Sequence, residues 1–379
     1  MPYSRFGQDV QQKGWVVTIS DLIDDWGGKV WVGAIGLFVV GALLAIILLL
    51  SLLFTGGAES GANAESLQQQ MPQKILTLGG FHQRRGGQMD VNYELDPETY
   101  QVREWPPRLI TKREDHVAGV YGRRIIVAGG KTGVHDSSHQ VATDKVELYD
   151  PDAGRFVAGP PMFKKRWWPG AAVIRNRFYV CGGYDGSAML RTCEYYDFDY
   201  DRWMMVRARM LRALNGMGAV AHDDRLYLMA GDTQRTMSRV NLMQCYDVAA
   251  DRFEQLDPVP NKLFTPTAVV YQNTILLCGG GDASDNFQRL CYTYDLYSRR
   301  WLGRSDRRRH PDLNIARTNH AMVLYKGERV FVVGGAARRS GDPRSRYTDT
   351  IEEYNSTTRR FRSQKVLLVP MDDFPAVVY

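Results

Sequence analysis

Basic residues are the most numerous candidates for chemistry in this sequence, and they occur in short clusters. Lysine and arginine number 48 against 42 aspartates and glutamates, which gives a formal net charge of +6. A surface that gathers such groups attracts acidic protein segments or anionic glycans through its electric field. The clustered residues are Arg84, Arg85, Lys112, Arg113, Lys164, Lys165, Arg166, Arg212, Arg235, Arg289, Arg307, Arg308, Arg309, Arg338 and Arg339.

Histidines are the candidates for metal binding. A zinc site needs three or four converging ligands, and polar loops attract histidine without any metal. The sequence contains neither a G-x-S-x-G nucleophile motif nor a P-loop. We therefore expect no catalytic residues, no cofactor and no metal. The histidines that fall in the same loop regions as the basic clusters are His82, His116, His135, His139, His310 and His320.

The elements that must position these residues repeat along the chain. A short apolar run ends in Gly-Gly, or in Ala-Gly in one copy, at Gly80, Gly130, Gly183, Gly231, Gly280 and Gly335. A tyrosine-rich segment follows and ends in Asp or Asn, and a bulky apolar residue stands six positions later. These pairs are Asp96 and Val102, Asp150 and Phe156, Asp197 and Trp203, Asp247 and Phe253, Asp295 and Trp301, and Asn355 and Phe361.

Each repeat is expected to form four short strands. Because a lone four-stranded sheet leaves a face unburied, six copies must stack around an axis as blades. Glycine followed by Tyr-Asp and then Trp or Phe at a fixed offset resembles the kelch-repeat β-propeller over roughly residues 74–379. Ala230, Val102 and Asn355 depart from the pattern. The resemblance implies an all-β, six-bladed propeller, in which an arginine before the first strand of a blade is ordinary.

The two ends of the repeat region predict how the ring closes. The first repeat begins at Lys74 with its second strand, and nothing before it resembles a first strand. The last six residues, 374–379 (FPAVVY), match the first-strand segment 266–271 (PTAVVY). We therefore expect residues 374–379 to supply the innermost strand of the first blade, which removes an open sheet edge.

Strand order then predicts where the basic clusters lie. Connections from strand two to strand three, and from strand four to the next blade, leave a blade on the same side, and the clusters fall in those connections. Acidic residues such as Asp115, Asp232, Asp282 and Asp342 are interspersed among them. The sequence predicts a loop-rich, basic face that binds a partner. The alternative is that these residues are the ordinary arginines of the kelch pattern and general surface charge.

The cysteines and one sequon bear on the compartment. Cys181 and Cys193, and likewise Cys278 and Cys291, occupy equivalent positions on adjacent strands of two blades, and Cys245 is left over. Disulfides would form there in an oxidising lumen, but we favour free thiols, because cross-strand geometry is demanding. Asn355-Ser356-Thr357 is an acceptor sequence for N-glycosylation.

The N-terminal region predicts a membrane anchor. Residues 31–54 are uncharged and apolar and would form a helix about 36 Å long, enough to cross a bilayer of about 30 Å. The expected organisation is a cytoplasmic segment 1–29, a helix 30–54, a flexible stalk 55–73 and the propeller 74–379. Lys13 and Lys29 before the span favour a cytoplasmic N-terminus and a luminal or extracellular propeller.

These features together predict a membrane-anchored, non-enzymatic propeller that binds a protein partner, with an acidic partner favoured and no nucleic acid. A cytosol-facing adaptor for cytoskeletal or ubiquitin-ligase partners is the alternative that the family resemblance implies. Residues 1–70 leave no room for the BTB domain of such ligase adaptors. The third alternative is a carbohydrate-binding or galactose-oxidase-like propeller, which would bring histidine, tyrosine and arginine together at the axis.

Overall fold

The computed structural model describes residues 73–82, 87–133, 141–233, 238–303, 311–338, 346–365, 367 and 369–379. These residues belong to one compact unit, Gln73–Tyr379. The predicted N-terminal segment, membrane helix and most of the stalk lie outside the described residues. Within the described part, no helix is long and apolar enough to cross a membrane.

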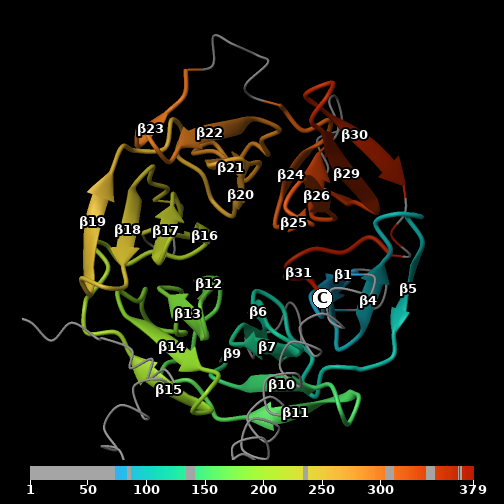
Figure 1. Cartoon of the computed structure of the whole chain (residues 1–379), viewed down its shortest axis with the longest axis vertical. Coiled ribbons are helices and arrows are strands. Elements are labelled where there is room, and N and C mark those ends of the chain that lie inside the picture. The colour runs from blue at the N-terminus through green and yellow to red at the C-terminus, as the bar shows by residue number, and fades with distance from the viewer. Residues whose placement is uncertain are drawn as a thin grey trace, which may run out of the picture. The chain divides into compact units, whose positions relative to one another are not determined.

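The unit is a six-bladed propeller in which each blade is an antiparallel sheet of four strands (Figure 1). Blade I consists of β31 (Ala376–Val378), β1 (Ile75–Leu78), β4 (Asn92–Leu95) and β5 (Val102–Trp105). Blade II consists of β6 (Val117–Tyr121), β7 (Arg124–Ala128), β10 (Val146–Asp150) and β11 (Arg155–Gly159). Blade III consists of β12 (Gly170–Ile174), β13 (Arg177–Cys181), β14 (Cys193–Asp197) and β15 (Arg202–Met205).

The remaining three blades follow the same order from the axis outward. Blade IV consists of β16 (Gly218–His222), β17 (Arg225–Met229), β18 (Met243–Asp247) and β19 (Arg252–Leu256). Blade V consists of β20 (Thr267–Tyr271), β21 (Thr274–Cys278), β22 (Cys291–Asp295) and β23 (Arg300–Trp301). Blade VI consists of β25 (Ala321–Tyr325), β26 (Arg329–Val333), β29 (Thr350–Asn355) and β30 (Arg360–Lys365).

Short strands lie in the connections between the second and third strands of blades I, II and VI and in the connection that leads into blade VI. β2 (Phe81–His82) pairs with β3 (Gly87–Gln88), and β8 (Lys131–Thr132) pairs with β9 (Val141–Ala142). β24 (Ala316–Thr318), β27 (Ala336–Arg338) and β28 (Arg346–Tyr347) form a third small sheet. All of these connections emerge on one side of the propeller, which we call the loop face.

The repeated sequence motif is explained by where each strand sits. The second strand, such as β7, is buried at every position after its first residue, which requires a continuous apolar run. The glycines that follow allow close backbone contact. Gly130 has φ +92°, and a Cβ there would lie 2.5 Å from the carbonyl oxygen of Glu114.

The recurring aspartate holds the turn between the third and fourth strands. The Asp150 carboxylate accepts a hydrogen bond from the Asp152 backbone N–H at 3.0 Å, and Asp295 accepts one from Ser298 at 2.6 Å. Asn355 accepts one from Thr358 in the same way at 2.7 Å. An amide oxygen serves this turn as well as a carboxylate does, and this explains why asparagine replaces aspartate without altering the blade.

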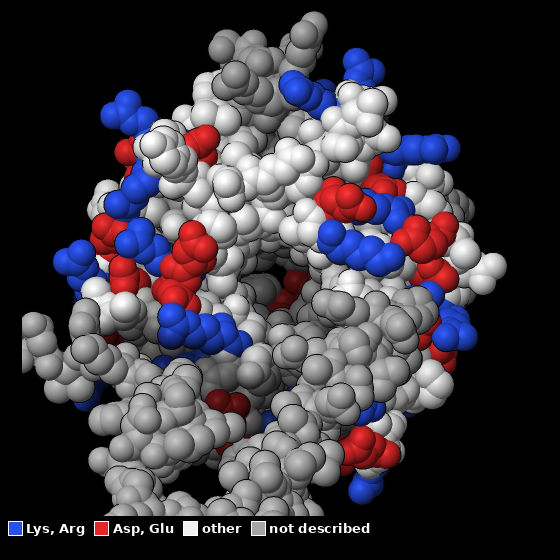
Figure 2. All heavy atoms as spheres, in the orientation of Figure 1, with Lys and Arg blue, Asp and Glu red and all other residues white. Residues whose placement is uncertain are grey.

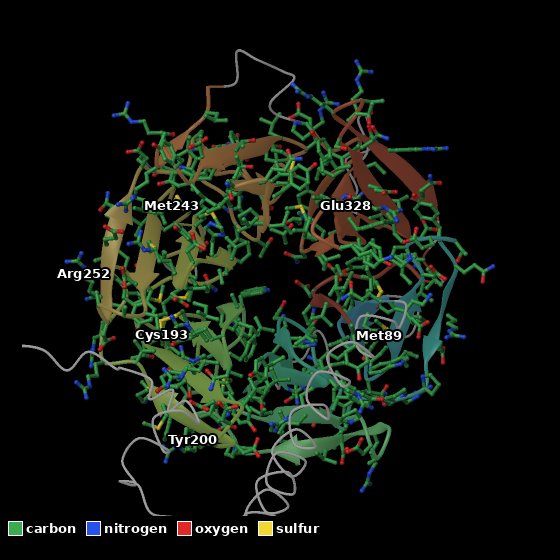
Figure 3. All side chains as sticks on the ribbon, in the orientation of Figure 1. Met89, Cys193, Tyr200, Met243, Arg252 and Glu328 are labelled. Atoms are coloured by element: carbon green, nitrogen blue, oxygen red, sulfur yellow. A yellow bond between two sulfur atoms is a disulfide. The ribbon has the colours of Figure 1, made fainter. Side chains whose placement is uncertain are left out.

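Side chains fill the space between the blades (Figure 3). The aromatic residue six positions after the recurring Asp contributes to this packing. Trp203 of blade III packs on Tyr196 with ring centroids 5.6 Å apart, and its indole N–H donates to the carbonyl oxygen of Pro160 at 2.9 Å. Pro160 follows the last strand of blade II, so this hydrogen bond joins neighbouring blades. Trp301 makes the equivalent hydrogen bond to Asp257 at 2.9 Å.

The C-terminal strand closes the ring as the sequence predicted. β31 pairs antiparallel with β1 in the register Ile75 with Val378, Leu76 with Val377 and Thr77 with Ala376. Backbone hydrogen bonds between Lys74 and Tyr379, 2.7 and 2.8 Å long, extend the pairing to the last residue. The edge of β1 that would face solvent is therefore paired.

The cysteines correct one expectation. Cys181 is bonded to Cys193 in blade III, and Cys278 to Cys291 in blade V, whereas we expected free thiols. In each pair the two residues stand directly opposite each other on antiparallel strands, with Cα atoms 4.1 Å apart. Direct cross-strand register therefore brings the two cysteines of each pair close enough to bond. Cys245 is a buried free cysteine.

Candidate functional site

Part of the predicted basic cluster lies exposed on the loop face. Lys112 precedes the first strand of blade II, Lys164 and Lys165 precede that of blade III, and Arg212 precedes that of blade IV. Arg289 lies in the connection between β21 and β22 of blade V, and it too is exposed. We call these five residues the basic rim.

Two other predicted residues, Arg113 and Arg166, are in the interior and cannot contact a partner. Both side chains are fully buried. Arg113 donates to Glu147 Oε1 at 2.6 Å, and Arg166 donates through Nε to Glu194 Oε1 at 2.9 Å. Each guanidinium group also binds backbone carbonyl oxygens of its own blade, so these arginines fasten the incoming loop to the blade.

The rest of the predicted basic residues fall where side chains are not described. Of Arg338 only the backbone is described, at the end of β27. Outside the described residues lie Arg84, Arg85, Arg235, Arg307, Arg308, Arg309 and Arg339.

The predicted glycosylation acceptor Asn355 is exposed, at the turn between β29 and β30 on the side opposite the loop face.

Sequence reasoning missed a set of exposed apolar residues beside the rim. Ile110, Phe163 and Leu211 occupy equivalent loop positions in blades II, III and IV, and they are 58%, 59% and 37% exposed. The backbone N–H of each donates to the buried carboxylate or amide of its blade, on Glu147, Glu194 and Gln244 respectively, at 2.6, 2.6 and 2.8 Å. That hydrogen bond fixes the loop, and the apolar side chain is held outward. We call these three residues the apolar arc.

Six residues just before the innermost strands are linked around the axis by five backbone hydrogen bonds and by one from the Asn319 N–H to Thr265 Oγ1 at 3.3 Å. Each member has φ between +48° and +60°, in the left-handed region. The N–H of Trp168 donates to the carbonyl of Asp115, Gly216 to Trp168, and Thr265 to Gly216, at 2.8 to 2.9 Å. Asp373 likewise donates to Asn319, and Asp115 to Asp373, both at 3.1 Å. The inner ring consists of Asp115, Trp168, Gly216, Thr265, Asn319 and Asp373, one residue from each blade.

The inner ring surrounds the entrance to a pocket on the axis, which we call the axial pocket. Its volume is about 220 Å³. Three residues after each ring position, the innermost strand contributes a side chain to the wall, namely Ala118, Ala171, Ala219, Ala268, Met322 and Ala376. Five of these are alanines, and the small side chains keep the axis open. Figure 2 shows acidic atoms within the central opening.

A buried acidic cluster lies where blades I and II meet. Glu114, Asp115 and Asp372 are 1%, 4% and 3% exposed. Lys131 Nζ lies 2.9 Å from Asp115 Oδ2 and 3.5 Å from Glu114 Oε1. Although burial lowers the pKa of Lys131, the Asp115 and Glu114 carboxylates outweigh it and raise that pKa, so the ammonium group stays charged.

The cluster leaves its remaining carboxyl groups short of positive charge. Burial, together with the neighbouring Asp115 and Asp372, raises the pKa of Asp373 well above its ordinary value of 3.8. Burial, Asp115 and Glu114 do the same for the pKa of Asp372. A carboxyl group holds its proton in this way when burial and like charges make ionisation costly.

The histidines at the axis serve packing. His116 and His320 directly follow ring positions, and both are buried, 5% and 3% exposed. Burial lowers the pKa of His320 to about 3 and that of His116 well below 6.5, so both are neutral. His320 Nε2 meets the Thr267 hydroxyl at 2.6 Å. Across the described residues, no group of three or more metal-ligating side chains is assembled.

Comparison with known proteins agrees with this architecture. A model of the Kelch motif matches residues 112–163 and 169–208. Kelch-like protein 25 from Xenopus tropicalis is 26% identical over 300 residues, covering 75% of this chain and 46% of the relative. Human Kelch-like protein 23 is 22% identical over 292 residues, covering 77% and 48%. Bovine Kelch-like protein 36 is 26% identical over 269 residues, covering 69% and 42%. The chain thus spans less than half the length of each of these relatives. Together with the six blades of the structure, these matches support a kelch β-propeller.

Proposed function

We propose that the chain is a non-enzymatic, membrane-tethered propeller that binds a protein partner through its loop face. The observation that carries this proposal is the apolar arc lying beside the basic rim. Interface cores are apolar and their rims are polar, and three successive blades present both kinds of side chain at the same loop position. A glycan or nucleic acid would use the cations but would leave the aliphatic side chains of Ile110 and Leu211 without a role.

The expected partner surface combines apolar and acidic groups. Lys112, Lys164 and Lys165 stand within two residues of the arc side chains Ile110 and Phe163. An acidic patch would be steered by these exposed cations, and the contact would then bury the apolar side chains. The association rate should therefore fall with added salt more than the dissociation rate rises.

Charge reversal tests this surface. The variant changes Lys112, Lys164, Lys165, Arg212 and Arg289 to glutamate in the full-length chain. The matched control reverses five exposed arginines on the opposite side, namely Arg123, Arg155, Arg202, Arg252 and Arg300. Chemical cross-linking in the cells that express the chain should yield partners that the rim variant loses and the control retains. Equal loss or equal retention in the two variants would refute binding through the loop face.

Two observations support a propeller that faces a lumen or the extracellular space. The disulfides of blades III and V are of a kind that persists in oxidising compartments and is rare in the cytosol. The acceptor residue Asn355 is exposed on a turn, where a glycan can be attached. We therefore propose residues 31–54 as a signal anchor with the N-terminus in the cytoplasm.

Protease treatment of sealed membranes tests the topology. A luminal propeller is protected from added protease, and its mass decreases on glycosidase treatment in the parent but not in an Asn355→Gln variant. A propeller that is digested without detergent would instead support the cytosol-facing adaptor, the alternative class proposed from the likeness to Kelch-like proteins. This result would leave binding through the loop face intact.

A further inference from the structure

We propose that a pocket between blades V and VI binds a sugar ring that carries a carboxylate, such as a hexuronic acid. Its volume is about 550 Å³, within the range of roughly 300–1,000 Å³ that is typical of small-molecule sites. Its exposed lining residues are Gln272, between β20 and β21, and Ser356 and Arg359, between β29 and β30. These turns lie on the side opposite the loop face, so the site is separate from the proposed partner surface. We call it the interblade pocket.

The interblade pocket is open because one side chain beside it is small. Between blades II and III the corresponding space is covered by Phe198, whose ring stacks on Tyr121 with centroids 5.1 Å apart. Blade VI has Ser356 at this position, and Ser356 lines the pocket together with Tyr271, the last residue of the first strand of blade V. A serine cannot cover that strand end as phenylalanine does. In the other five blades the residue directly after the recurring aspartate is apolar, namely Pro97, Pro151, Phe198, Val248 and Leu296.

The pocket also contains a cation whose acidic counterpart has been replaced. The equivalent arginine of blade V, Arg299, lies with its Nη2 atom 2.5 Å from Glu254 Oε1 of blade IV. At the position of Glu254, blade V has Leu302, which lines the pocket with Arg359 of blade VI. None of the described lining residues is acidic. The Arg359 guanidinium is therefore placed to form a bidentate pair with the carboxylate of a ligand.

Two tyrosines add aromatic surface to the lining. Tyr271 and Tyr354 come from the two blades and meet edge to face, with ring centroids 5.8 Å apart. Burial and the neighbouring Tyr271 raise the pKa of Tyr354, and the positive charge of Arg359 opposes them. The guanidinium group therefore acts on the tyrosines rather than extending away from them. Aromatic rings of this kind pack on the C–H face of a sugar, while their hydroxyl groups offer hydrogen bonds.

The combined lining favours an acidic sugar over simpler ligands. A small inorganic anion would use Arg359 alone and would leave most of the volume unfilled. An apolar ligand would bury the Gln272 amide, the Ser356 hydroxyl and the Arg359 guanidinium without hydrogen bonds, which is costly. A ring that carries several hydroxyl groups and one carboxylate meets all of these groups.

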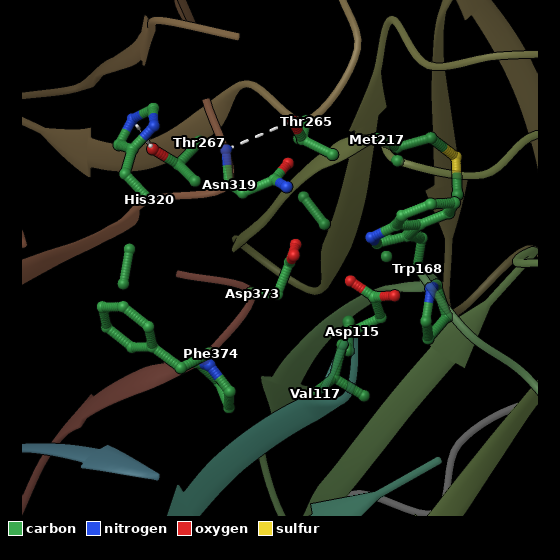
Figure 4. Close-up of a pocket in the computed structure, with 18 of the residues that line it drawn as sticks. Asp115, Val117, Trp168, Met217, Thr265, Thr267, Asn319, His320, Asp373 and Phe374 are labelled. Atoms are coloured by element: carbon green, nitrogen blue, oxygen red, sulfur yellow. Dashed lines mark hydrogen bonds between the residues drawn. The ribbon is translucent and has the colours of Figure 1, made fainter. Parts of the chain in front are cut away.

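The axial pocket differs, because its charges are paired within the protein. Asp115 and Asp373 approach each other there from neighbouring blades (Figure 4). Lys131 Nζ lies 2.9 Å from Asp115 Oδ2, and the raised pKa of Asp373 keeps its proton in place. A charged ligand therefore gains less in the axial pocket than beside Arg359.

The test uses a matched pair of probes on the full-length chain in micelles of an uncharged detergent. Methyl β-D-glucuronide carries a carboxylate where methyl β-D-glucoside carries a neutral hydroxymethyl group. Titrations followed by saturation-transfer difference NMR should show the glucuronide binding about tenfold more tightly, as expected for one charge-assisted hydrogen bond.

Four variants locate the binding. Arg359→Gln removes the cation, and Leu302→Glu restores the acidic residue that blade IV has. Each should weaken the glucuronide at least about fivefold and leave the glucoside unchanged. Ser356→Leu introduces the side chain that blade V has at this position and should weaken both probes, while Asn355 and Thr357 keep the glycosylation sequence intact. Arg299→Gln is the matched control and should change neither affinity, because Arg299 is the equivalent turn arginine outside the pocket.

Several results would overturn the proposal. These are equal binding of the two probes, undiminished glucuronide binding in both Arg359→Gln and Leu302→Glu, and no binding of the glucuronide up to about 50 mM. Equal weakening by Arg299→Gln would place the binding elsewhere on the propeller. Cyclohexanecarboxylate has a ring and a carboxylate but no hydroxyl groups. If it binds as tightly as the glucuronide, the assignment to a sugar is wrong.

Discussion

The buried ion pair between Arg166 and Glu194 should be replaceable as a unit but not one partner at a time. Three blades contain an Arg–Glu pair at equivalent positions, whereas blade IV has Leu214 and Gln244 there. The Gln244 amide oxygen still accepts the loop N–H of Leu211, at 2.8 Å. The chain itself therefore contains the exchanged version of the pair, which predicts that Arg166→Leu with Glu194→Gln is tolerated.

The magnitudes follow from burial and hydrogen bonding. Both side chains of the pair are 0% exposed, and Glu194 accepts hydrogen bonds from Arg166 Nε, Phe163 N and Lys164 N. Arg166→Leu alone strands a buried carboxylate and should cost about 3–5 kcal/mol. The double variant keeps the amide acceptor for the loop and removes the charge, so it should recover about 2–3 kcal/mol of that loss.

Urea unfolding followed by tryptophan fluorescence measures the difference. Arg177→Leu is the matched control in the same blade, because Arg177 is 39% exposed in its pair with Asp197 and should contribute only about 0–1 kcal/mol. If the double variant is as unstable as Arg166→Leu alone, the pair is not an independent unit and the comparison with blade IV is invalid.

Three further predictions follow from closure, charge and sulfur. Deleting residues 374–379 unpairs β1 and removes the buried Phe374, whose truncation alone would cost about 3–5 kcal/mol, so an unchanged melting temperature would contradict closure. Because the pKa of Asp373 is raised in the folded state, its protonation adds stability below about pH 4 that is lost as pH rises through the folded-state pKa. Asp373→Asn should therefore be more stable than the parent at pH 8 and equal to it near pH 4. Urea unfolding midpoints measured at both pH values test this, and the opposite order of stability would contradict it. Thiol labelling of the unreduced, unfolded chain should modify Cys245 alone, whereas labelling of all five cysteines would show that neither disulfide forms.

The fold was predictable because its determinants are local and repeated. Buried second strands need apolar runs, their ends need glycine, and the next turn needs a short acceptor such as Asp150. The ends of the chain revealed closure, because residues 374–379 match a first strand that the first repeat lacks. Six copies of these features determine the number of blades.

The site was less predictable because it depends on contacts between distant residues. Lys112 and Arg113 are neighbours in sequence, yet one is exposed and the other is buried beside Glu147. Asp373 meets Asp115 across more than 250 residues, and only ring closure brings them together. The apolar arc carried one usable signal, an apolar residue just before each basic cluster, at Ile110, Phe163 and Leu211.

The most direct test of the central claim places a photo-cross-linker on each side of blade III. Benzoylphenylalanine replaces Phe163 on the loop face, which is 59% exposed, or Tyr200 on the opposite turn, which is 68% exposed. Both sites are aromatic and belong to the same blade, so they differ chiefly in the face they report. Binding through the loop face predicts a partner cross-linked from position 163 and none from position 200. A partner captured equally from both positions, or from position 200 alone, would contradict it.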